Sequence, residues 1–439
     1  MTDRSLDPSV EADFGPGRSG RRTADHPEGT EPLAPDLLRY AQADPAWRLA
    51  TLAVHAGQAP DPLTGSVSPP IYQTSTFAQE AVGQPRGGWE YARTGNPTRA
   101  RLEEAVAALE GGRFGLAFAS GSATTAAIAA LAVPGDEVVV SDDVYGGTYR
   151  LFEQVLRPMG IAARYVDLST DAPAALAKAL SPRTRLVWVE TPSNPWLKLI
   201  DLEAVAKVLA DRGGSSRPVL VADGTFASPV VQRPLALGAD IVYHSATKYL
   251  AGHSDTVSGV LVTSREDLYE RLHFLQNAVG AVPSPFDCYL VLRGLRTLPL
   301  RVERHASNAL AVAQALAARR DVATVRYPGL AKGPQAHPQA ALAARQMALS
   351  GGMVSFLPAA RGGRSPEERA RRFCEATHLF TLAESLGGVE SLCEIPALMT
   401  HGSVQGSPLE VPASLVRLSV GIEDPADLVA DVTQALDRA

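Results

Sequence analysis

Short apolar runs alternate with helical segments from about residue 96 to residue 262 of this chain. The apolar runs cover residues 115–119, 137–140, 185–189, 219–222, 240–243 and 259–262. Segments of helical periodicity lie between most of these runs, at residues 149–157, 172–180 and 202–210. Strands separated by helices form mostly parallel sheets that carry helices on both faces. The sequence therefore predicts an α/β fold.

The 439 residues divide into four predicted segments. Residues 1–47 are rich in Pro, Gly, Asp and Glu and have almost no apolar periodicity, so we expect a disordered tail. Residues 48–107 form an N-terminal arm and a helix capped by Asn96. Residues 108–300 form the large domain. Residues 301–439 open with a long Ala-rich helical pattern and form a smaller C-terminal α/β domain.

Composition and charge exclude several classes of function. The net charge of −6 gives no electrostatic reason to expect nucleic acid or an anionic membrane as a partner. The longest stretch of small apolar residues, 116–133, is interrupted by Ser, Gly and Thr and is a poor membrane span. The three cysteines, Cys288, Cys374 and Cys393, are far apart in the sequence. A sparse and odd set of this kind is typical of reduced thiols in the cytosol, not of a disulfide framework. Since no secretory or transit pattern is visible, we expect a cytoplasmic protein.

Reactive side chains follow several predicted strands, at the end of the sheet where α/β proteins bind their ligands. Lys248 is one of only five lysines, and it follows Ser245 and Thr247 directly after a predicted strand. Asp223 ends another predicted strand 25 residues earlier. That distance fits one strand-helix-strand step, which would bring both strand ends to one crevice.

Each of these residues also has an ordinary explanation. A single lysine is usually solvated, an Asp after a strand is often a helix cap, and a pair such as Gly121-Ser122 is usually only a turn. Together, however, they supply what pyridoxal 5'-phosphate (PLP) requires: a lysine for covalent attachment, an acid that keeps the ring nitrogen protonated, and donors for the phosphate. The combination therefore favours a PLP enzyme that uses Lys248 and Asp223.

Several longer motifs resemble one known family. They are YARTGNPT (91–98), DDVYGGT (142–148), ETPSNP (190–195), SATKY (245–249), GHSD (252–255), AESLGGVESL (383–392) and RLSVGIE (417–423). In this order they resemble the Cys/Met-metabolism PLP-dependent enzymes, and within that family the cystathionine γ-synthases and γ-lyases. The resemblance covers about residue 50 to the C-terminus. It implies the PLP-dependent transferase fold of type I, with residues 108–300 as the PLP-binding domain.

The resemblance also implies roles at the cofactor. Lys248 resembles the Schiff-base lysine and proton shuttle, Asp223 the partner of the pyridinium nitrogen, and Tyr145 the aromatic residue that stacks on the ring. The phosphate is then expected to contact the backbone of Gly121 and Ser122 and the hydroxyls of Ser245 and Thr247. In this family Tyr91 and Arg93 reach the phosphate of the neighbouring subunit. The implied assembly is a homotetramer made of two dimers that share active sites.

At the substrate, Arg417 resembles the arginine that grips the α-carboxylate, a task suited to its planar fork, and Asn194 and Ser385 assist it. Glu384 accompanies members of the family that work at the γ-carbon. Gly147 matches the synthases and γ-lyases, whereas methionine γ-lyases carry a cysteine there. The expected substrates are therefore small amino acids that react at the γ-carbon.

Four positions depart from the family pattern. Gly224 replaces a usual Asn, Ser122 a common Met, Ala246 a Thr and Ser258 a Gly. Because these changes surround the expected cofactor, and because Gly224 removes a side chain beside Asp223, we expect a wider or looser pocket. The corresponding hypothesis is that the enzyme keeps its chemistry at the γ-carbon but accepts a substrate other than the standard one of the family.

The favoured function is γ-replacement on O-succinyl- or O-acetylhomoserine by a thiol such as cysteine, as in cystathionine γ-synthase. The alternatives are γ-elimination, as in cystathionine γ-lyase, and γ-substitution with a non-standard nucleophile. An aminotransferase of the same fold and a silent PLP-binding protein also stay open. A Rossmann oxidoreductase is disfavoured because no G-x-G-x-x-G follows a strand. His244 and His253 have no third ligand at suitable spacing, so we expect no metal.

Overall fold

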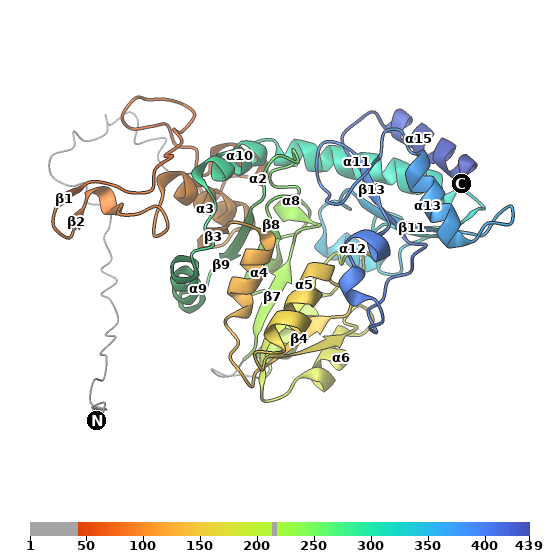
Figure 1. Ribbon diagram of the computed structural model, residues 1–439, viewed down its shortest axis with the longest axis horizontal. Coiled ribbons are helices and arrows are strands. Elements are labelled where there is room, and N and C mark those ends of the chain that lie inside the picture. Colours follow the sequence, from red (N-terminus) through yellow and green to blue (C-terminus); the bar gives the residue numbers. More distant parts are fainter. Residues whose placement is uncertain (1–42, 213–216) are drawn as a thin grey trace, which may run out of the picture.

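The computed structural model describes residues 43–212 and 217–439 (Figure 1). Of the predicted tail, residues 1–42 lie outside the described residues. The segment that follows contains α2 (Leu49–His55), the short hairpin β1 (Gln79–Ala81) and β2 (Gln84–Pro85), and the turn η1 (Arg86–Gly88). Figure 1 shows β1 and β2 projecting from the body of the molecule.

In the described part of the chain, the large domain is built on a seven-stranded sheet of order β3-β9-β8-β7-β6-β4-β5. β9 runs antiparallel to both of its neighbours, and the pairs from β8 to β5 are parallel. The mostly parallel sheet predicted from the sequence is thereby confirmed. The strands are β3 (Phe114–Phe118), β4 (Glu137–Ser141), β5 (Ala162–Val166), β6 (Thr184–Glu190), β7 (Val219–Asp223), β8 (Ile241–Ser245) and β9 (Gly259–Thr263).

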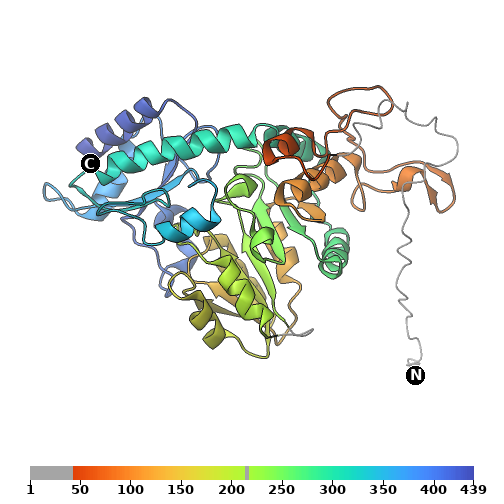
Figure 2. The same cartoon turned by 180° about the vertical axis from the view of Figure 1, so that it is seen from behind.

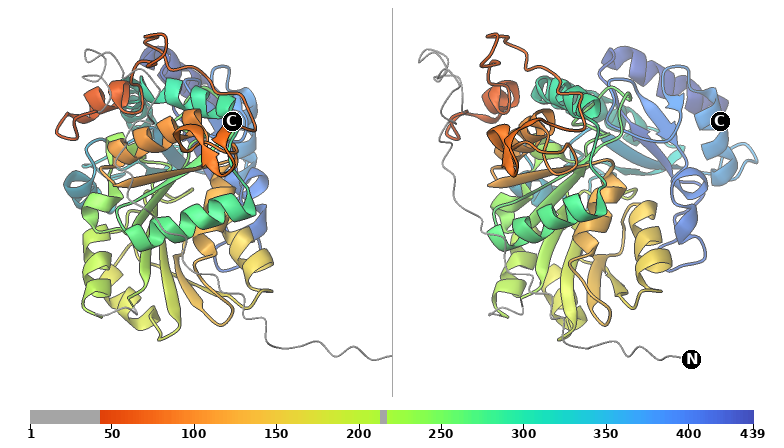
Figure 3. Two further views of the ribbon diagram at one scale, coloured as in Figure 1. Left: turned by 90° about the vertical axis from the view of Figure 1, so that its left-hand side faces the viewer. Right: turned by 60° about the vertical axis from the view of Figure 1, so that its left-hand side comes forward.

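Helices cover both faces of this sheet, as Figure 3 shows. Alternate side chains of one strand enter different cores: Trp188 packs with residues of α4 and α9, whereas Val187 packs with α6 and α7. This two-sided burial explains why the strands are almost continuously apolar. The helices of the domain are α4 (Gly121–Ala129), α5 (Gly146–Arg150), the π-helix η2 (Leu151–Leu156), α6 (Ala172–Ala179), α7 (Leu202–Ala210), α8 (Ser228–Val231), η3 (Pro234–Leu237), α9 (Glu266–Val279) and α10 (Pro285–Leu295). Helix α3 (Pro97–Glu110), which most of the arm segment precedes, packs against β3 and β9 of this sheet.

The long helix α11 (Leu298–Ala317) leads from the large domain into the C-terminal domain, as Figure 2 shows from behind. There a five-stranded sheet has the order β10-β11-β14-β13-β12. Its strands are β10 (Val322–Arg326), β11 (Met353–Pro358), β12 (Thr381–Leu382), β13 (Leu392–Glu394) and β14 (Val416–Ser419). The other helices are α12 (Ala340–Gln346), α13 (Pro366–Ala376), α14 (Pro396–Met399), η4 (Gly402–Val404) and α15 (Pro425–Arg438).

Two elements differ from the sequence-based expectation. The helix expected over residues 149–157 begins earlier, at Gly146, and continues as the π-helix η2. β5 has no counterpart among the predicted strands, because it is the edge strand and its side chains are only partly buried. Within the described residues, every helix is too short or too polar to cross a membrane.

Candidate active site

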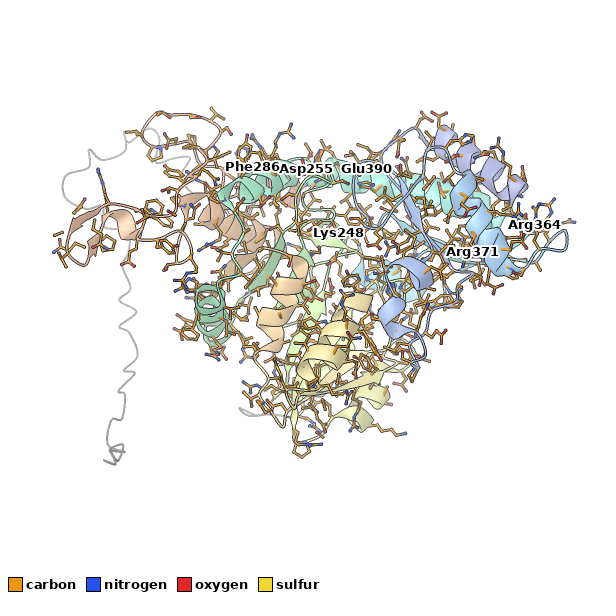
Figure 4. The ribbon with its side chains drawn as sticks, in the orientation of Figure 1. Lys248, Asp255, Phe286, Arg364, Arg371 and Glu390 are labelled. Carbon is orange, nitrogen blue, oxygen red and sulfur yellow. The ribbon has the colours of Figure 1, made fainter. Side chains whose placement is uncertain are left out.

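A cavity of about 660 Å³ opens at the carboxyl ends of the parallel strands, where the large domain meets the C-terminal domain. Lys248 lies at this junction, near the middle of the molecule in Figure 4. Nearly all of the expected site residues line the cavity together, although they come from both domains. They are Gly121, Ser122, Tyr145, Asn194, Asp223, Ser245, Thr247, Lys248, Glu384, Ser385 and Arg417.

Lys248 follows β8 in a short turn that directs its side chain into the cavity. Its Nζ donates a hydrogen bond to Oγ of Ser385 at 2.7 Å. Burial, and next the charge of Arg417, lower the pKa of Lys248 to about 8. A substantial fraction of this amine is therefore neutral near physiological pH, and only the neutral amine attacks a carbonyl group.

Asp223 is the last residue of β7, and it is a buried residue in the lining of the cavity. Its Oδ1 accepts a hydrogen bond from the backbone N–H of Thr225 at 2.9 Å. Burial raises the pKa of Asp223, while the hydrogen bonds from Thr225 act in the opposite direction. A buried carboxylate of this kind is most stable opposite a cation, and a protonated ring nitrogen is such a group.

Gly121 starts helix α4, with Ser120 as its N-cap. A Cβ atom at residue 121 would lie 2.8 Å from Cβ of Ser245, so a larger residue would push α4 away from the end of β8. The free N–H groups at a helix N-terminus bind phosphate well. Together with the hydroxyl of Ser245, this edge fits the phosphate of a cofactor.

Arg417 lies on β14 and reaches the cavity from the C-terminal domain. Its guanidinium donates to Oδ1 of Asn194 at 2.9 Å and to the backbone oxygen of Ser385 at 3.0 Å. It also forms an ion pair with Glu394 at 3.1 Å, and the side chains are 2% and 1% exposed. Its fixed orientation and charge suit a substrate carboxylate.

Tyr145 is the residue before α5, and its ring meets that of His401 edge to face, with centroids 6.4 Å apart. A Cβ atom at residue 147 would lie 2.3 Å from Cε1 of Tyr145. Gly147 therefore leaves room for the aromatic ring, which gives a steric reason for the glycine that the sequence alone presents only as a family feature.

The structure adds residues that the sequence analysis did not single out. Glu190 lies beside Asp223, Glu394 pairs with Arg417, and the exposed Arg150 also lines the cavity. Glu190 ends a predicted strand, so the strand-end rule that selects Asp223 was the available signal for it. Arg150 and Glu394 had no such signal, because their place depends on how α5 and the C-terminal domain pack.

The expectation that Gly224 widens the pocket is wrong. Gly224 does not line the cavity, and a Cβ atom there would lie 2.7 Å from Cε1 of His244. The space beside Gly224 is thus filled by the ring of His244, whose Nε2 lies 2.6 Å from Oε1 of Glu110. His253 has its Nδ1 2.7 Å from the backbone oxygen of Ala251. The two histidines therefore serve separate local contacts.

Tyr91 and Arg93 are the two expected residues that do not line the cavity of their own chain. Both are exposed on the arm, and Arg93 donates to the backbone oxygen of Asn277 at 3.0 Å near the end of α9. Both side chains therefore lie away from the cavity of their own chain.

A lysine with a lowered pKa, a buried acid at a neighbouring strand end and a helix N-terminus beside strand-end hydroxyls fit PLP. On this fold, they define a PLP-dependent enzyme of fold type I. Residues 50–437 match the family described as Cys/Met metabolism PLP-dependent enzyme, and the chain belongs to that family.

Individual relatives cover most of the chain. It is 55% identical to the cystathionine γ-synthase of Mycobacterium tuberculosis over 88% of this chain and 96% of the relative. It is 49% identical to the cystathionine γ-lyase of Dictyostelium discoideum over 89% of this chain and 98% of the relative. The crystal structure of metB from Corynebacterium glutamicum superposes with a TM-score of 0.84 at 49% identity, covering 90% of this chain and 99% of the other.

Proposed function

We propose that the enzyme replaces the γ-substituent of an activated homoserine by a thiol such as cysteine, as a cystathionine γ-synthase does. The observation that carries this proposal is the presence of two arginines in one cavity with Lys248. Arg417 suits the α-carboxylate, and Arg150, an exposed residue, lines the same cavity. Among the described residues Arg150 has no ion-pair partner, so a second carboxylate is a natural ligand. This favours O-succinylhomoserine over the acetyl ester.

The residues divide the proposed reaction between them. PLP, when bound, takes up the electrons released when a C–H bond of the substrate breaks. Arg417 and Asn194 orient the amino acid by its carboxylate, and the neutral amine of Lys248 removes the α-proton. Asp223 keeps the ring nitrogen protonated, and Tyr145 holds the ring in place. Lys248 is also close enough to Glu384 for its charge to act on the amine.

In the overall reaction the bond from the γ-carbon to the ester oxygen breaks, and a bond from the γ-carbon to the thiol sulfur forms. The thiol proton and the released carboxylate balance the equation, so no oxidant is needed. O-Succinylhomoserine and cysteine would give cystathionine and succinate.

Product analysis by mass spectrometry tests the proposal. Purified holoenzyme is incubated with O-succinylhomoserine, O-acetylhomoserine, cystathionine or methionine, each with and without cysteine. Fast formation of cystathionine from the succinyl ester is expected. A 2-oxo acid formed from cystathionine, with little γ-replacement, would contradict the proposal. Amino transfer to a keto acid without loss of a γ-group would instead indicate an aminotransferase.

The γ-lyase alternative has specific support, because the chain resembles the Dictyostelium γ-lyase almost as closely as the mycobacterial synthase. Both reactions use the same groups and differ in whether a thiol or water completes the turnover. The ratio of cystathionine to 2-oxo acid at saturating cysteine separates them.

We further propose that two subunits share each active site, with Tyr91 and Arg93 from one reaching the phosphate site of the other, and that two such dimers form a homotetramer. The arm and the end of α9 carry exposed apolar side chains, including Tyr91 at 46% and Val279 at 74% exposure. Exposed apolar side chains gathered in this way are typical of subunit interfaces. Analytical ultracentrifugation tests the assembly, and a monomer at micromolar concentration would contradict it.

We also propose a cytoplasmic location, where its small amino-acid substrates are available. In support, Cys288, Cys374 and Cys393 are all free and buried. Cell fractionation with antibody detection tests this point, and recovery outside the cytoplasmic fraction would contradict it.

A further inference from the structure

Glu190 is a buried acid at the floor of the site to which neither the sequence motifs nor the proposed reaction gives a task. It is the last residue of β6, and its side chain is 3% exposed. Its Oε2 accepts a hydrogen bond from the backbone N–H of Tyr145 at 2.9 Å. The carboxyl thus connects the end of β6 to the loop that follows β4.

The same residue lies directly beside Asp223. Glu190 and Asp223 are paired in the register of β6 and β7, both as the last residue of their strand. The hydrogen bond to Glu190 holds the backbone of Tyr145, the residue just before α5. One carboxyl group therefore links the two residues expected on the face and on the nitrogen of the cofactor ring.

We propose that Glu190 is a positioning residue that fixes Tyr145 relative to Asp223, and that it does so as a neutral carboxylic acid. The inference rests on the proposed placement of Tyr145 and Asp223 at the ring, and it does not depend on which substrate the enzyme takes. In this proposal Glu190 fixes how the ring of Tyr145 stacks on the cofactor ring, while Lys248 carries out the proton transfers.

Electrostatics supports the neutral form. Burial, and next the charge of Asp223, raise the pKa of Glu190 well above its usual value, and Asp143 acts in the same direction. Tyr243 and His244 are further titratable groups that act on this pair. When two buried carboxyl groups are adjacent, ionising both has a high free-energy cost, so one of them stays protonated. A neutral Glu190 therefore lets Asp223 keep its charge for the ring nitrogen while Oε2 still accepts from Tyr145.

Three variants of Glu190 test the inference. Glu190→Gln keeps a neutral side chain of the same length, whereas Glu190→Ala and Glu190→Asp cannot hold the backbone of Tyr145. The readouts are the affinity of the apoprotein for PLP, by fluorescence titration, and the visible circular dichroism of bound PLP, which reports its orientation. We expect Glu190→Gln to stay within about twofold of wild type in both, and the other two variants to lose about tenfold in affinity, as a lost hydrogen bond predicts.

Glu137→Ala is the matched control. Glu137 is also a buried acid on a strand of this sheet, but it begins β4 at the opposite end and pairs with Arg183. Its loss is expected to lower the urea midpoint and leave PLP affinity and dichroism unchanged. If Glu190→Ala fails to fold, Glu190→Asp carries the test.

Wild-type affinity and dichroism in Glu190→Ala or Glu190→Asp would overturn the tether. A Glu190→Gln variant as impaired as Glu190→Ala would overturn the neutral form. Tyr145→Ala and Asp223→Ala separate this inference from the site assignment. If these two variants leave the PLP signals unchanged, the assignment itself fails; if they change the signals and the Glu190 variants do not, only the inference fails.

Discussion

Oγ of Ser385 lies 2.7 Å from Nζ of Lys248, although the two residues are 137 positions apart and belong to different domains. Ser385 has a φ of 91°, a backbone conformation that non-glycine residues rarely adopt. The strained serine thus places its hydroxyl on the lysine amine. Strained backbone conformations are concentrated at functional sites, so the strain at Ser385 indicates a function for its hydroxyl.

Replacing Ser385 tests this contact. Ser385→Ala should lower kcat about fivefold, because a lost hydrogen bond of roughly 1 kcal/mol leaves the amine less well placed. PLP absorption should be retained. Ser385→Gly should lose the same activity but raise the thermal midpoint, since glycine adopts this φ without strain. Steady-state kinetics and thermal melts measure both, and full activity in Ser385→Ala would contradict the prediction.

The pKa of Lys248, lowered to about 8 by burial, predicts how the stability of the apoprotein depends on pH. An unfolded lysine has a pKa of about 10.4, so the unfolded chain binds more protons between about pH 8 and pH 10.4. The free energy of unfolding therefore rises with pH across this window. Below about pH 8 the buried, charged lysine destabilises the fold by its full amount.

Urea unfolding of apoprotein from pH 7.5 to 9.5 measures this contribution, as the difference between wild type and Lys248→Met. The difference cancels the tyrosines and cysteines that titrate in the same range. The variant should be the more stable protein at pH 7.5, and its advantage should shrink as the pH rises. A difference that does not change with pH would show that the lysine is not shifted. The variant should also lack PLP-dependent turnover.

The buried pair of Arg417 and Glu394 predicts separate effects on stability and on substrate binding. Glu394→Ala leaves a buried guanidinium without its counter-charge and should cost about 3 kcal/mol of unfolding free energy. Arg417→Lys should raise KM for the amino-acid substrate at least about tenfold, because an ammonium cannot hold a carboxylate with two parallel hydrogen bonds.

The double variant Glu394→Met/Arg417→Met is the control for this pair. It removes both charges together, so it should recover stability relative to Glu394→Ala and still bind substrate poorly. Urea midpoints and substrate titrations distinguish the two effects. Unchanged stability in Glu394→Ala would contradict the prediction.

The shared site predicts complementation between subunits. Lys248→Ala alone should be inactive, and Arg93→Ala alone should be strongly impaired. Mixed dimers would contain one site with both changes and one with neither. Random mixing of equal amounts should then restore about a quarter of wild-type turnover, as two-fold symmetry requires. Mixtures that stay at the level of the separate variants would argue that each subunit is complete.

Much of this architecture was predictable because it depends on local sequence patterns. The apolar runs from residue 115 to residue 262 became strands, because burial on both faces requires continuous apolar sequence. The strand-end rule brought Asp223 and Lys248 to one cavity. The family motifs added Arg417, which no local pattern connects to Lys248.

The remainder depends on packing between distant segments. That His244 fills the space beside Gly224 follows from the register of β7 and β8, which the sequence does not specify. Glu394 became the partner of Arg417 because β13 and β14 are neighbours in the small sheet. Edge strand β5 was missed because partial burial gives a weak apolar signal.

Helix α11 has a consequence for how the enzyme can lose function. Its first turns, with Leu298 and Val302, pack into a core of the large domain, whereas Ala309 and Val312 belong to the core of the C-terminal domain. Lys248 and Asp223 depend on the first body, and Arg417 on the second. Heat or denaturant that unfolds only the C-terminal domain would leave a yellow protein that retains its cofactor but no longer binds its substrate. Colour alone is therefore a poor measure of how much of a preparation is competent.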